Sequence, residues 1–376
     1  MTLSPAGDIK KMIAPLIIPQ PHSLSPSSYG AQNATITPPL TPSSPSYSAF
    51  HPANASPPRP EPSLLSLPYS SLLGTGAWSK VYSLGEVSIA VKTPVNISAR
   101  AVLESEAKIL SYVASALTHN SGIAAFHGYD PVTAAVYMEL IPGGTLETHL
   151  ESCTPAHIRA PAIGMPQWLF LAEQLARTFS ALKRTNVVHG DIKLGNILLR
   201  PWSPPPSAAV DPIWAAYIRG GGTLLEPVVV DFSSAHINLP CELPEAMSAV
   251  TTAYAAPELL QSFLSEPRHP LPTHASDLYS LALSLLAAAV GSEVYRNAGK
   301  HVGIYVRQGN PMGWVKADER GMKVGRGGAV SEVLEGCFGK TAEGRTGVEE
   351  LGVRVEGWKK AWWNEGRTSG NPRWGC

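Results

Sequence analysis

Three polar side chains within one short segment could carry out chemistry together: Asp191, Lys193 and Asn196. An aspartate can position or deprotonate a hydroxyl group, a lysine can neutralise a phosphate, and an asparagine can hold a metal ion. The spacing therefore suits the transfer of a charged group to a hydroxyl. A histidine beside an aspartate, as at His189, is more often structural, so this interpretation depends on the rest of the chain.

A second pair of charges is predicted between Lys92 and Glu106. Lys92 ends the apolar run 89–91, where an ammonium group is costly unless it is paired or binds an anion. On the predicted helix 100–113, Glu106 falls within the apolar face, whereas Glu104 lies about 200° around the helix axis. A carboxylate on the buried face predicts an ion pair with Lys92.

The elements that must position these residues change character along the chain. Residues 69–92 alternate between apolar and polar with glycine turns, which predicts three antiparallel strands, and two further strands are expected on either side of residues 130–131. Beyond Gly144 the pattern is mostly helical. One predicted helix carries an apolar stripe that leads into the segment at Asp191, formed by Trp168, Leu171, Ala172, Leu175, Phe179 and Leu182. A small β-rich half followed by a larger helical half predicts an α+β fold with two lobes.

Domain boundaries follow from composition. Residues 1–63 are dense in proline and serine and are expected to be a disordered tail, because such a composition buries too little apolar surface to offset its ordering entropy. The folded domain is expected over 64–362, with the smaller lobe at 64–141 and the larger at 142–362. A surface insertion is expected at about 201–226 and a C-terminal tail at 363–376.

Charge and cysteine content exclude several classes of function. The 376 residues have no formal net charge and only 15% charged residues, so neither nucleic acid nor an anionic membrane is expected as a partner. The four cysteines form no C-x-x-C pair, which argues against a zinc site and a disulfide framework and favours a reducing compartment. The longest apolar stretch, 278–290, is shorter than the roughly 20 residues of a membrane span. An intracellular protein, cytoplasmic or nuclear, is therefore expected.

Residues 187–196 resemble the catalytic loop of protein kinases, H-R-D-x-x-x-x-N, with Gly190 in place of the arginine. Other motifs of that family occur in the family's order. They are a glycine-rich loop at 73–81, a V-A-I-K-like strand at 89–92, a hinge at 136–144 and a D-F-G-like turn at 228–233. An A-P-E segment follows at 251–258, then an S-D-x-W-S-L-like helix start at 276–281 and a C-L…R-P-T-like match at 337–346. The chain is thus similar to protein kinases over residues 73–346, with the two-lobed fold of that family.

The resemblance implies ATP and Mg²⁺ as cofactors, with Asn196 and Asp231 as the metal ligands. It implies a catalytic set of Asp191, Lys193, Lys92 and Glu106. The nucleotide would contact residues of the glycine-rich loop, the first strands and the hinge, namely Leu73, Gly74, Gly76, Val81, Ala90, Lys92, Met138, Glu139, Ile141 and Leu198.

The family pattern also implies particular contacts around the site. Phe232 would pack beneath the helix that carries Glu106, and Asp277 would hold the backbone of the catalytic loop. Arg345 would pair with Glu258, and Lys193 would touch a threonine of the segment that precedes A-P-E, expected at Thr252.

The function implied is a Ser/Thr protein kinase acting on protein hydroxyls, because a lysine two residues after the aspartate is typical of that class. Two alternatives stay open. One is a catalytically inactive scaffold, for which Ser79, Gly190 and Ser233 are the departures from the family pattern. The other is a kinase of small-molecule hydroxyls, which also use the H-G-D sequence. The proline-rich tail is a candidate for binding partner modules.

Gly190 has a regulatory implication. Kinases with arginine at this position use a phosphorylated residue of the activation segment to neutralise it. With Gly190 there is no such cation, so activity is expected without phosphorylation of Ser248 or Thr251.

Overall fold

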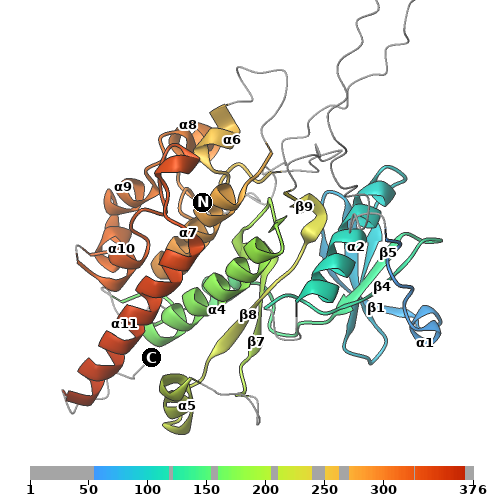
Figure 1. Ribbon diagram of the computed structural model, residues 1–376, viewed down its shortest axis with the longest axis horizontal. Coiled ribbons are helices and arrows are strands. Elements are labelled where there is room, and N and C mark those ends of the chain that lie inside the picture. Colours follow the sequence, from blue (N-terminus) through green and yellow to red (C-terminus); the bar gives the residue numbers. More distant parts are fainter. Residues whose placement is uncertain are drawn as a thin grey trace, which may run out of the picture.

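Two lobes make up the computed structural model, a sheet with one long helix and a larger set of helices (Figure 1). The described parts of the chain are residues 55–117, 122–153, 160–204, 211–238, 250–261, 271–325 and 327–368. Ser248 and most of the predicted N-terminal tail lie outside these residues.

The small lobe is built on a five-stranded antiparallel sheet with the strand order β1-β2-β3-β5-β4. Its strands are β1 (Tyr69–Thr75), β2 (Ser79–Leu84), β3 (Ile89–Pro94), β4 (Phe126–Asp130) and β5 (Ala135–Glu139). The three strands predicted between residues 69 and 92 and the two that flank 130–131 are confirmed. Lys92 lies in the central strand β3, opposite Val81 on one side and Val136 on the other.

The helix α2 (Ala99–Ala116) packs its apolar face toward this sheet and toward the large lobe. Glu106 belongs to that buried face with Leu103 and Leu110, and only 1% of its surface is exposed. Glu104 faces solvent and pairs with Lys108 at 2.9 Å. The predicted division of the two glutamates between the faces of this helix is confirmed.

The folded part of the chain begins before the predicted boundary at residue 64. A short helix, α1 (Pro62–Leu65), precedes β1, and the Pro58 carbonyl accepts a 2.9 Å hydrogen bond from the Tyr129 N–H on the edge strand β4. Pro60 is buried against Gly128, whose φ is +132° and whose missing Cβ would lie 2.5 Å from Pro60 N. Residues 55–63, expected to be disordered, therefore include a segment packed on the sheet.

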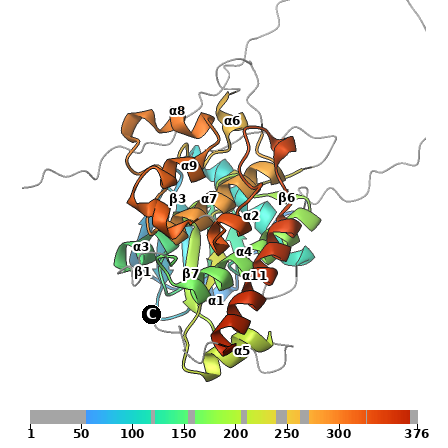
Figure 2. The same cartoon turned by 90° about the vertical axis from the view of Figure 1, so that its left-hand side faces the viewer.

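Helices form most of the large lobe (Figures 1 and 2). They are α3 (Leu146–Ser152), α4 (Met165–Arg184), α5 (Pro212–Arg219), α6 (Pro257–Gln261), α7 (His274–Val290), α8 (Val302–Arg307), α9 (Pro311–Lys316), α10 (Ala329–Val333) and α11 (Val348–Thr368). Short 3-10 turns lie at Leu194–Asn196, Phe232–Ser234, Gly299–His301, Glu319–Lys323 and Ala342–Gly344. None of the helices among these described residues is long and apolar enough to cross a membrane.

The centre of the large lobe is α7, which is buried from Ser276 to Val290. A helix that is apolar all round is stable only inside a core. Its start is fixed by a reciprocal cap, in which Thr273 Oγ1 accepts from Ser276 N–H and Ser276 Oγ accepts from Thr273 N–H. This cap sets the position of Asp277 in the first turn. Gly291, with φ +81°, ends the helix.

Helix α4 carries the predicted apolar stripe, and all six of its residues are buried. The helix ends at Arg184, just before the two-residue strand β6 (Val187–Val188), which pairs with β9 (His236–Ile237). Helix α11 runs alongside α4 (Figures 1 and 2) and continues to Thr368, so the tail predicted from residue 363 starts inside a helix.

The predicted surface insertion is in part an extended hairpin with a packed helix. Strand β7 (Ile197–Pro201) pairs with β8 (Leu225–Val229), so both ends of the predicted range 201–226 belong to strands. Helix α5 follows residues 205–210, which are not described, and buries Trp214 to 1% exposure against Phe170 of α4 and Trp362 of α11. The range predicted as a surface insertion therefore includes a helix with one fully buried side chain, Trp214.

One buried lysine fastens α5 and α11 to α4. The Lys359 ammonium has no exposed surface and lies 3.1 Å from Glu173 Oε1, 2.6 Å from Asp211 Oδ2 and 2.5 Å from Glu356 Oε2. Trp214 Nε1 also donates to Glu173, at 2.5 Å. The three carboxylates are close enough to hold a metal ion, but the lysine ammonium already supplies the positive charge between them.

Candidate active site

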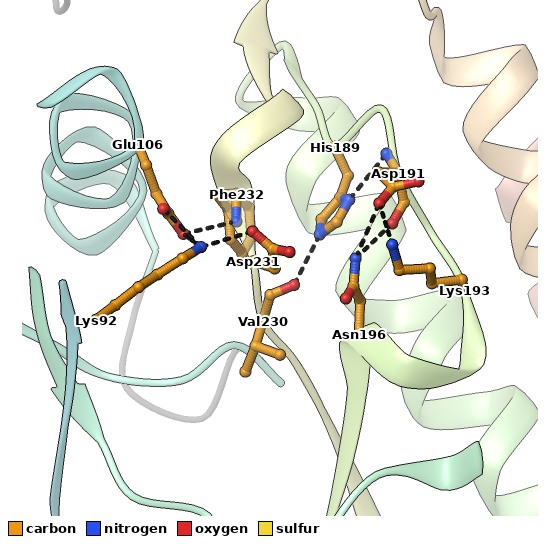
Figure 3. Close-up of polar contacts among 9 residues, drawn as sticks. All are labelled: Lys92, Glu106, His189, Asp191, Lys193, Asn196, Val230, Asp231 and Phe232. Carbon is orange, nitrogen blue, oxygen red and sulfur yellow. Dashed lines mark hydrogen bonds and ion pairs between the residues drawn. The ribbon is translucent and has the colours of Figure 1, made fainter. Parts of the chain in front are cut away.

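Lys92, Glu106 and Asp231 meet where the two lobes face each other (Figure 3). Lys92 Nζ lies 2.8 Å from each oxygen of Glu106 and 2.6 Å from Asp231 Oδ1. The central strand provides the lysine and α2 provides the glutamate. Asp231 follows β8, so three separate elements meet at one ammonium group. The predicted Lys92–Glu106 ion pair is confirmed.

In this group, Lys92 and Asp231 each stabilise the charged form of the other. Burial alone would lower the pKa of Lys92, but the carboxylates of Asp231 and Glu106 outweigh burial and raise it. Burial alone would raise the pKa of Asp231, but the Lys92 charge and hydrogen bonds from Lys92 and Ser233 lower it. Lys92 is therefore held as a cation and Asp231 as an anion, the states that can grip a phosphate and a metal ion.

The turn after Asp231 is joined to α2. Asp231 has a left-handed backbone, with φ +65° and ψ +72°. Phe232 is 1% exposed, and its N–H donates to Glu106 Oε1 at 3.1 Å, which confirms that it packs beneath this helix. Ser233 stands where the family has glycine, and its side chain contributes to the lowered pKa of Asp231.

The catalytic-loop residues converge on Asp191 (Figure 3). Lys193 Nζ donates to Asp191 Oδ2 at 2.6 Å, and Asn196 Nδ2 donates to the Asp191 carbonyl at 2.8 Å. Thr251 supplies a third contact, because its N–H donates to Asp191 Oδ1 at 3.0 Å. The two oxygens of Asp191 are thus directed by groups on both sides of the loop.

The threonine beside Lys193 is Thr251, and not Thr252 as predicted. Lys193 Nζ donates to Thr251 Oγ1 at 3.0 Å. Thr251 lies just before a turn over residues 252–254, and its carbonyl accepts from the Tyr254 N–H at 2.9 Å, whereas Thr252 lies inside that turn. Motif matching did not distinguish between them.

Asp277 binds the backbone of the catalytic loop, as predicted. Its carboxylate accepts from His189 N–H at 2.7 Å and from Gly190 N–H at 3.0 Å. Burial raises the pKa of Asp277 to about 7, against the lowering effect of these two donors. The cap of α7 fixes the position of the Asp277 carboxylate, and the buried helix therefore fixes the position of the loop backbone at His189 and Gly190.

His189 links the catalytic loop to the strand before Asp231 (Figure 3). Its Nε2 lies 3.1 Å from the Val230 carbonyl, and its Nδ1 accepts from Asp191 N–H at 3.3 Å. The ring therefore carries its proton on Nε2 and is neutral, in keeping with burial, which lowers the pKa of His189. Its ring centroid lies 4.8 Å from that of Phe232.

Gly190 is required by the local geometry. Its φ is +81°, a region that L-residues rarely adopt, and a Cβ there would lie 2.6 Å from the Ser234 carbonyl oxygen. The turn at Phe232–Ser234 thus packs directly on the catalytic loop, in the space that a side chain would need.

The predicted nucleotide-contacting residues come from both lobes. Ala90, Met138 and Ile141 are buried, and Leu198 packs beside Ile141. Val81 is partly buried on β2. Leu73 is 49% exposed on β1, and the Gly76 N–H donates to the Ser79 carbonyl at 2.8 Å in the turn between β1 and β2. A Cβ at Gly74 would meet no atom within 4 Å, so the backbone there is open to close approach.

Asn196 and Asp231 fit a hard divalent cation. The Asn196 amide nitrogen is taken up by Asp191, which leaves its carbonyl oxygen as the ligand atom. Asp231 is ionised, and 34% of its side chain is exposed. Oxygen donors of this kind are those that Mg²⁺ prefers. The Val230 N–H donates to the backbone carbonyl of Asn196 at 3.0 Å, which joins the segment that carries Asn196 to the segment that carries Asp231.

The predicted pair of Arg345 and Glu258 is present. Arg345 NH1 donates to Glu258 Oε1 at 2.7 Å, and its NH2 donates to Glu258 Oε2. The arginine is fully buried and also donates to the carbonyls of Ala275 and Gly339. The pair fastens α6, which follows Thr251, to the core of the large lobe.

Arg200 and Glu226, two charged residues near the hinge, were not predicted from the sequence. Arg200 contacts Glu139 at 2.6 Å and Glu226 at 2.7 Å. A signal existed, because Arg200 closes the apolar run 197–199 in the same way that Lys92 closes its own strand.

Two lobes with a lysine–glutamate–aspartate group between them, facing an aspartate–lysine–asparagine loop, define the class of protein kinases. The family model described as protein kinase domain matches residues 68–351, and the chain belongs to this family.

Several curated relatives carry the name of serine/threonine-protein kinases. The chain is 29% identical over 233 residues to serine/threonine-protein kinase ISR1 of Eremothecium gossypii, a match that covers 60% of this chain and 58% of the relative. It is 28% identical over 255 residues to ISR1 of Saccharomyces cerevisiae, covering 61% of this chain and 52% of the relative. It is 30% identical over 135 residues to serine/threonine-protein kinase PknK of Mycobacterium tuberculosis, covering 36% of this chain and 10% of the relative. The chain thus spans just over half the length of the two ISR1 proteins.

Proposed function

We propose that this chain is a Ser/Thr protein kinase that transfers the γ-phosphate of Mg-ATP to hydroxyls of protein substrates. One observation carries the proposal: Lys92 is joined at once to Glu106 and Asp231, while Asp191, Lys193 and Asn196 are assembled in the facing loop. The names of the relatives support the Ser/Thr class and a protein acceptor.

Each residue has a role that follows from its chemistry. The Lys92 ammonium, held by Glu106, neutralises the α- and β-phosphates of the nucleotide. Asp191 orients the acceptor hydroxyl and takes its proton, and Lys193 offsets charge on the moving phosphoryl group. Asn196 and Asp231 hold Mg²⁺, which supplies charge neutralisation at the phosphates when bound. Positioning and electrostatics account for most of the acceleration in such a site.

The test is transfer of labelled γ-phosphate from Mg-ATP to generic Ser/Thr acceptor proteins and to the chain itself. We expect transfer by the native chain and a loss of at least about 100-fold in Asp191→Asn, the scale of a general base. Magnesium-dependent ATP binding should persist in this variant, because Asp191 is not a proposed ligand. Binding without transfer to any protein, but with transfer to small alcohols or amino-alcohols, would instead indicate a small-molecule kinase. Absence of both binding and transfer would indicate a scaffold.

We further propose that activity does not require phosphorylation of the activation segment. Gly190 provides no cation beside Asp191 for a phosphate to neutralise, and Thr251 already contacts Asp191 and Lys193 without any phosphate. The turn at Ser234 packs on Gly190 through its backbone.

This second proposal is tested with chain treated with phosphatase and shown by mass spectrometry to carry no phosphate. The expected initial rate of transfer equals that of untreated chain, and Ser248→Ala should behave in the same way. A gain of tenfold or more on phosphorylation of the segment would contradict the proposal.

A further inference from the structure

Glu139 is the last residue of β5, where the chain leaves the small lobe, and its carboxylate contacts both lobes. Its Oε2 accepts a 3.2 Å hydrogen bond from Ala125 N–H, just before β4 in the small lobe. Its Oε1 accepts a 2.6 Å hydrogen bond from Arg200 NH1, on β7 in the large lobe. A single carboxylate therefore bridges the junction between the lobes.

Arg200 is itself held in place by a second carboxylate. Its Nε donates to Glu226 Oε2 at 2.7 Å, and the two residues are direct partners in the β7–β8 ladder. The exposed fractions of the side chains are 26% for Arg200, 29% for Glu139 and 18% for Glu226. A planar guanidinium between two partly buried carboxylates has a fixed orientation, which a lysine could not reproduce. We call these three residues the hinge clamp.

The backbone runs closely through the same junction. Glu139 N–H donates to the Ala125 carbonyl at 2.8 Å, and Leu199 N–H donates to the Gly144 carbonyl at 2.9 Å. At Gly143 a Cβ would lie 2.2 Å from the Leu199 carbonyl oxygen, so the hinge lies directly against β7. The hinge clamp therefore reinforces a contact that already sets how the hinge meets the large lobe.

We propose that Arg200 is a positioning residue for the nucleotide, which acts through Glu139 to fix the hinge backbone in the arrangement that the adenine would contact. The inference rests on the proposed nucleotide-dependent function. The hinge clamp is present in the same structure in which Lys92, Glu106 and Asp231 are assembled, and it links the two lobes directly. Its loss would widen the range of lobe orientations and weaken nucleotide binding, while the groups at Asp191 stay unchanged.

The experiment uses the full chain and its Arg200→Met variant. Hydrogen–deuterium exchange of residues 139–144, measured without nucleotide, reports on the hinge itself. Binding of a non-hydrolysable ATP analogue with Mg²⁺, measured by calorimetry, reports on the site. We expect faster exchange in the hinge and a Kd about five- to tenfold higher in the variant. The KM for ATP should rise by a similar factor at unchanged kcat, a division that general destabilisation would not produce.

The matched control is Lys183→Met, which removes the pair of Lys183 with Glu349 in the large lobe, at 2.8 Å. It should change neither hinge exchange nor nucleotide affinity. A double-mutant cycle with Glu139→Gln provides a further check, because the effects of the two substitutions on Kd should not add if both break one interaction. Should Arg200→Met fail to fold, Glu226→Gln takes its place, with a smaller rise in Kd expected.

Three outcomes would overturn the inference. Native exchange and native Kd in Arg200→Met would show that the clamp does not position the hinge. Additive effects in the cycle would show that Arg200 and Glu139 act separately. Failure of the native chain to bind the Mg²⁺-loaded analogue would overturn the proposed function as well, and this case is recognised in the native chain alone.

Discussion

At the scale of single residues, two of the three departures from the family pattern have specific effects on their neighbours. Ser233 contributes to the lowered pKa of Asp231, and Gly190 leaves room for the backbone of Ser234. Both substitutions thus lie between the turn after Asp231 and the catalytic loop. Neither removes a group that the proposed chemistry needs.

Gly190→Ala should lower the free energy of unfolding through two effects, backbone strain and a steric clash. A left-handed conformation costs an L-residue about 1–2 kcal/mol. At Gly190 the new methyl would also lie 2.6 Å from Ser234 O, whereas at Gly221, with φ +90°, nothing lies within 4 Å. Gly221→Ala is therefore the matched control, and Gly190→Ala should cost at least about 1 kcal/mol more. Urea unfolding measures both, and equal losses would contradict the contact.

Much of the site could be predicted residue by residue because its signals are local. The position of Glu106 follows from helical periodicity, and the need of Lys92 for a partner follows from the apolar strand before it. The choice between Thr251 and Thr252 could not be predicted, because it depends on how the turn at residues 252–254 is placed against a loop that lies 60 residues away in the sequence.

At the scale of elements, strands and helices were predicted well where periodicity is strong, as in α2 and α4. Helix α5 was missed because its burial depends on partners from distant segments. Glu173, Asp211 and Lys359 come together only after α4, α5 and α11 have packed. No pattern within any one of these segments shows that a lysine will lose all contact with water.

Lys359→Met should be among the most damaging substitutions outside the active site. It leaves three carboxylates facing one another without the ammonium, and breaking a buried ion pair typically costs about 3–5 kcal/mol. Lys360→Met is the control, because Lys360 is 64% exposed and, within the described ranges, pairs with Glu356 alone, at 3.2 Å. That change should cost less than about 1 kcal/mol. Chemical unfolding of both variants tests the difference, and a similar loss in the two would refute the role of Lys359.

At the scale of the whole molecule, stability depends on pH through two buried groups that meet at the catalytic loop, His189 and Asp277. Burial lowers the pKa of His189, so the unfolded chain binds a proton at mildly acidic pH that the folded chain does not. Its contribution to stability is present above the unfolded pKa of about 6.5 and is lost as the pH falls below it. Asp277, with its pKa raised to about 7, acts in the opposite direction, because the folded chain binds the extra proton.

The contribution of His189 can be separated by comparing the native chain with His189→Gln, whose amide can still donate to Val230 O and accept from Asp191 N–H. From pH 6.5 to 5.5 the native chain should lose up to about 1 kcal/mol more stability than the variant. Unfolding free energies at three pH values measure this difference. Parallel profiles would mean that His189 takes up a proton in the folded state.

The segment 57–60, which packs against the edge strand β4, should affect how readily the protein aggregates. An uncovered edge strand offers unpaired N–H and carbonyl groups to any other chain and is a starting point for aggregation. Here Pro58 takes the Tyr129 N–H, and Pro57, Pro58 and Pro60 have no N–H groups of their own to present outward. The segment next to the sheet edge therefore offers few N–H groups with which another strand could pair. Chains shortened to residue 64 should form sheet-rich aggregates at lower concentration than chains that begin at residue 55.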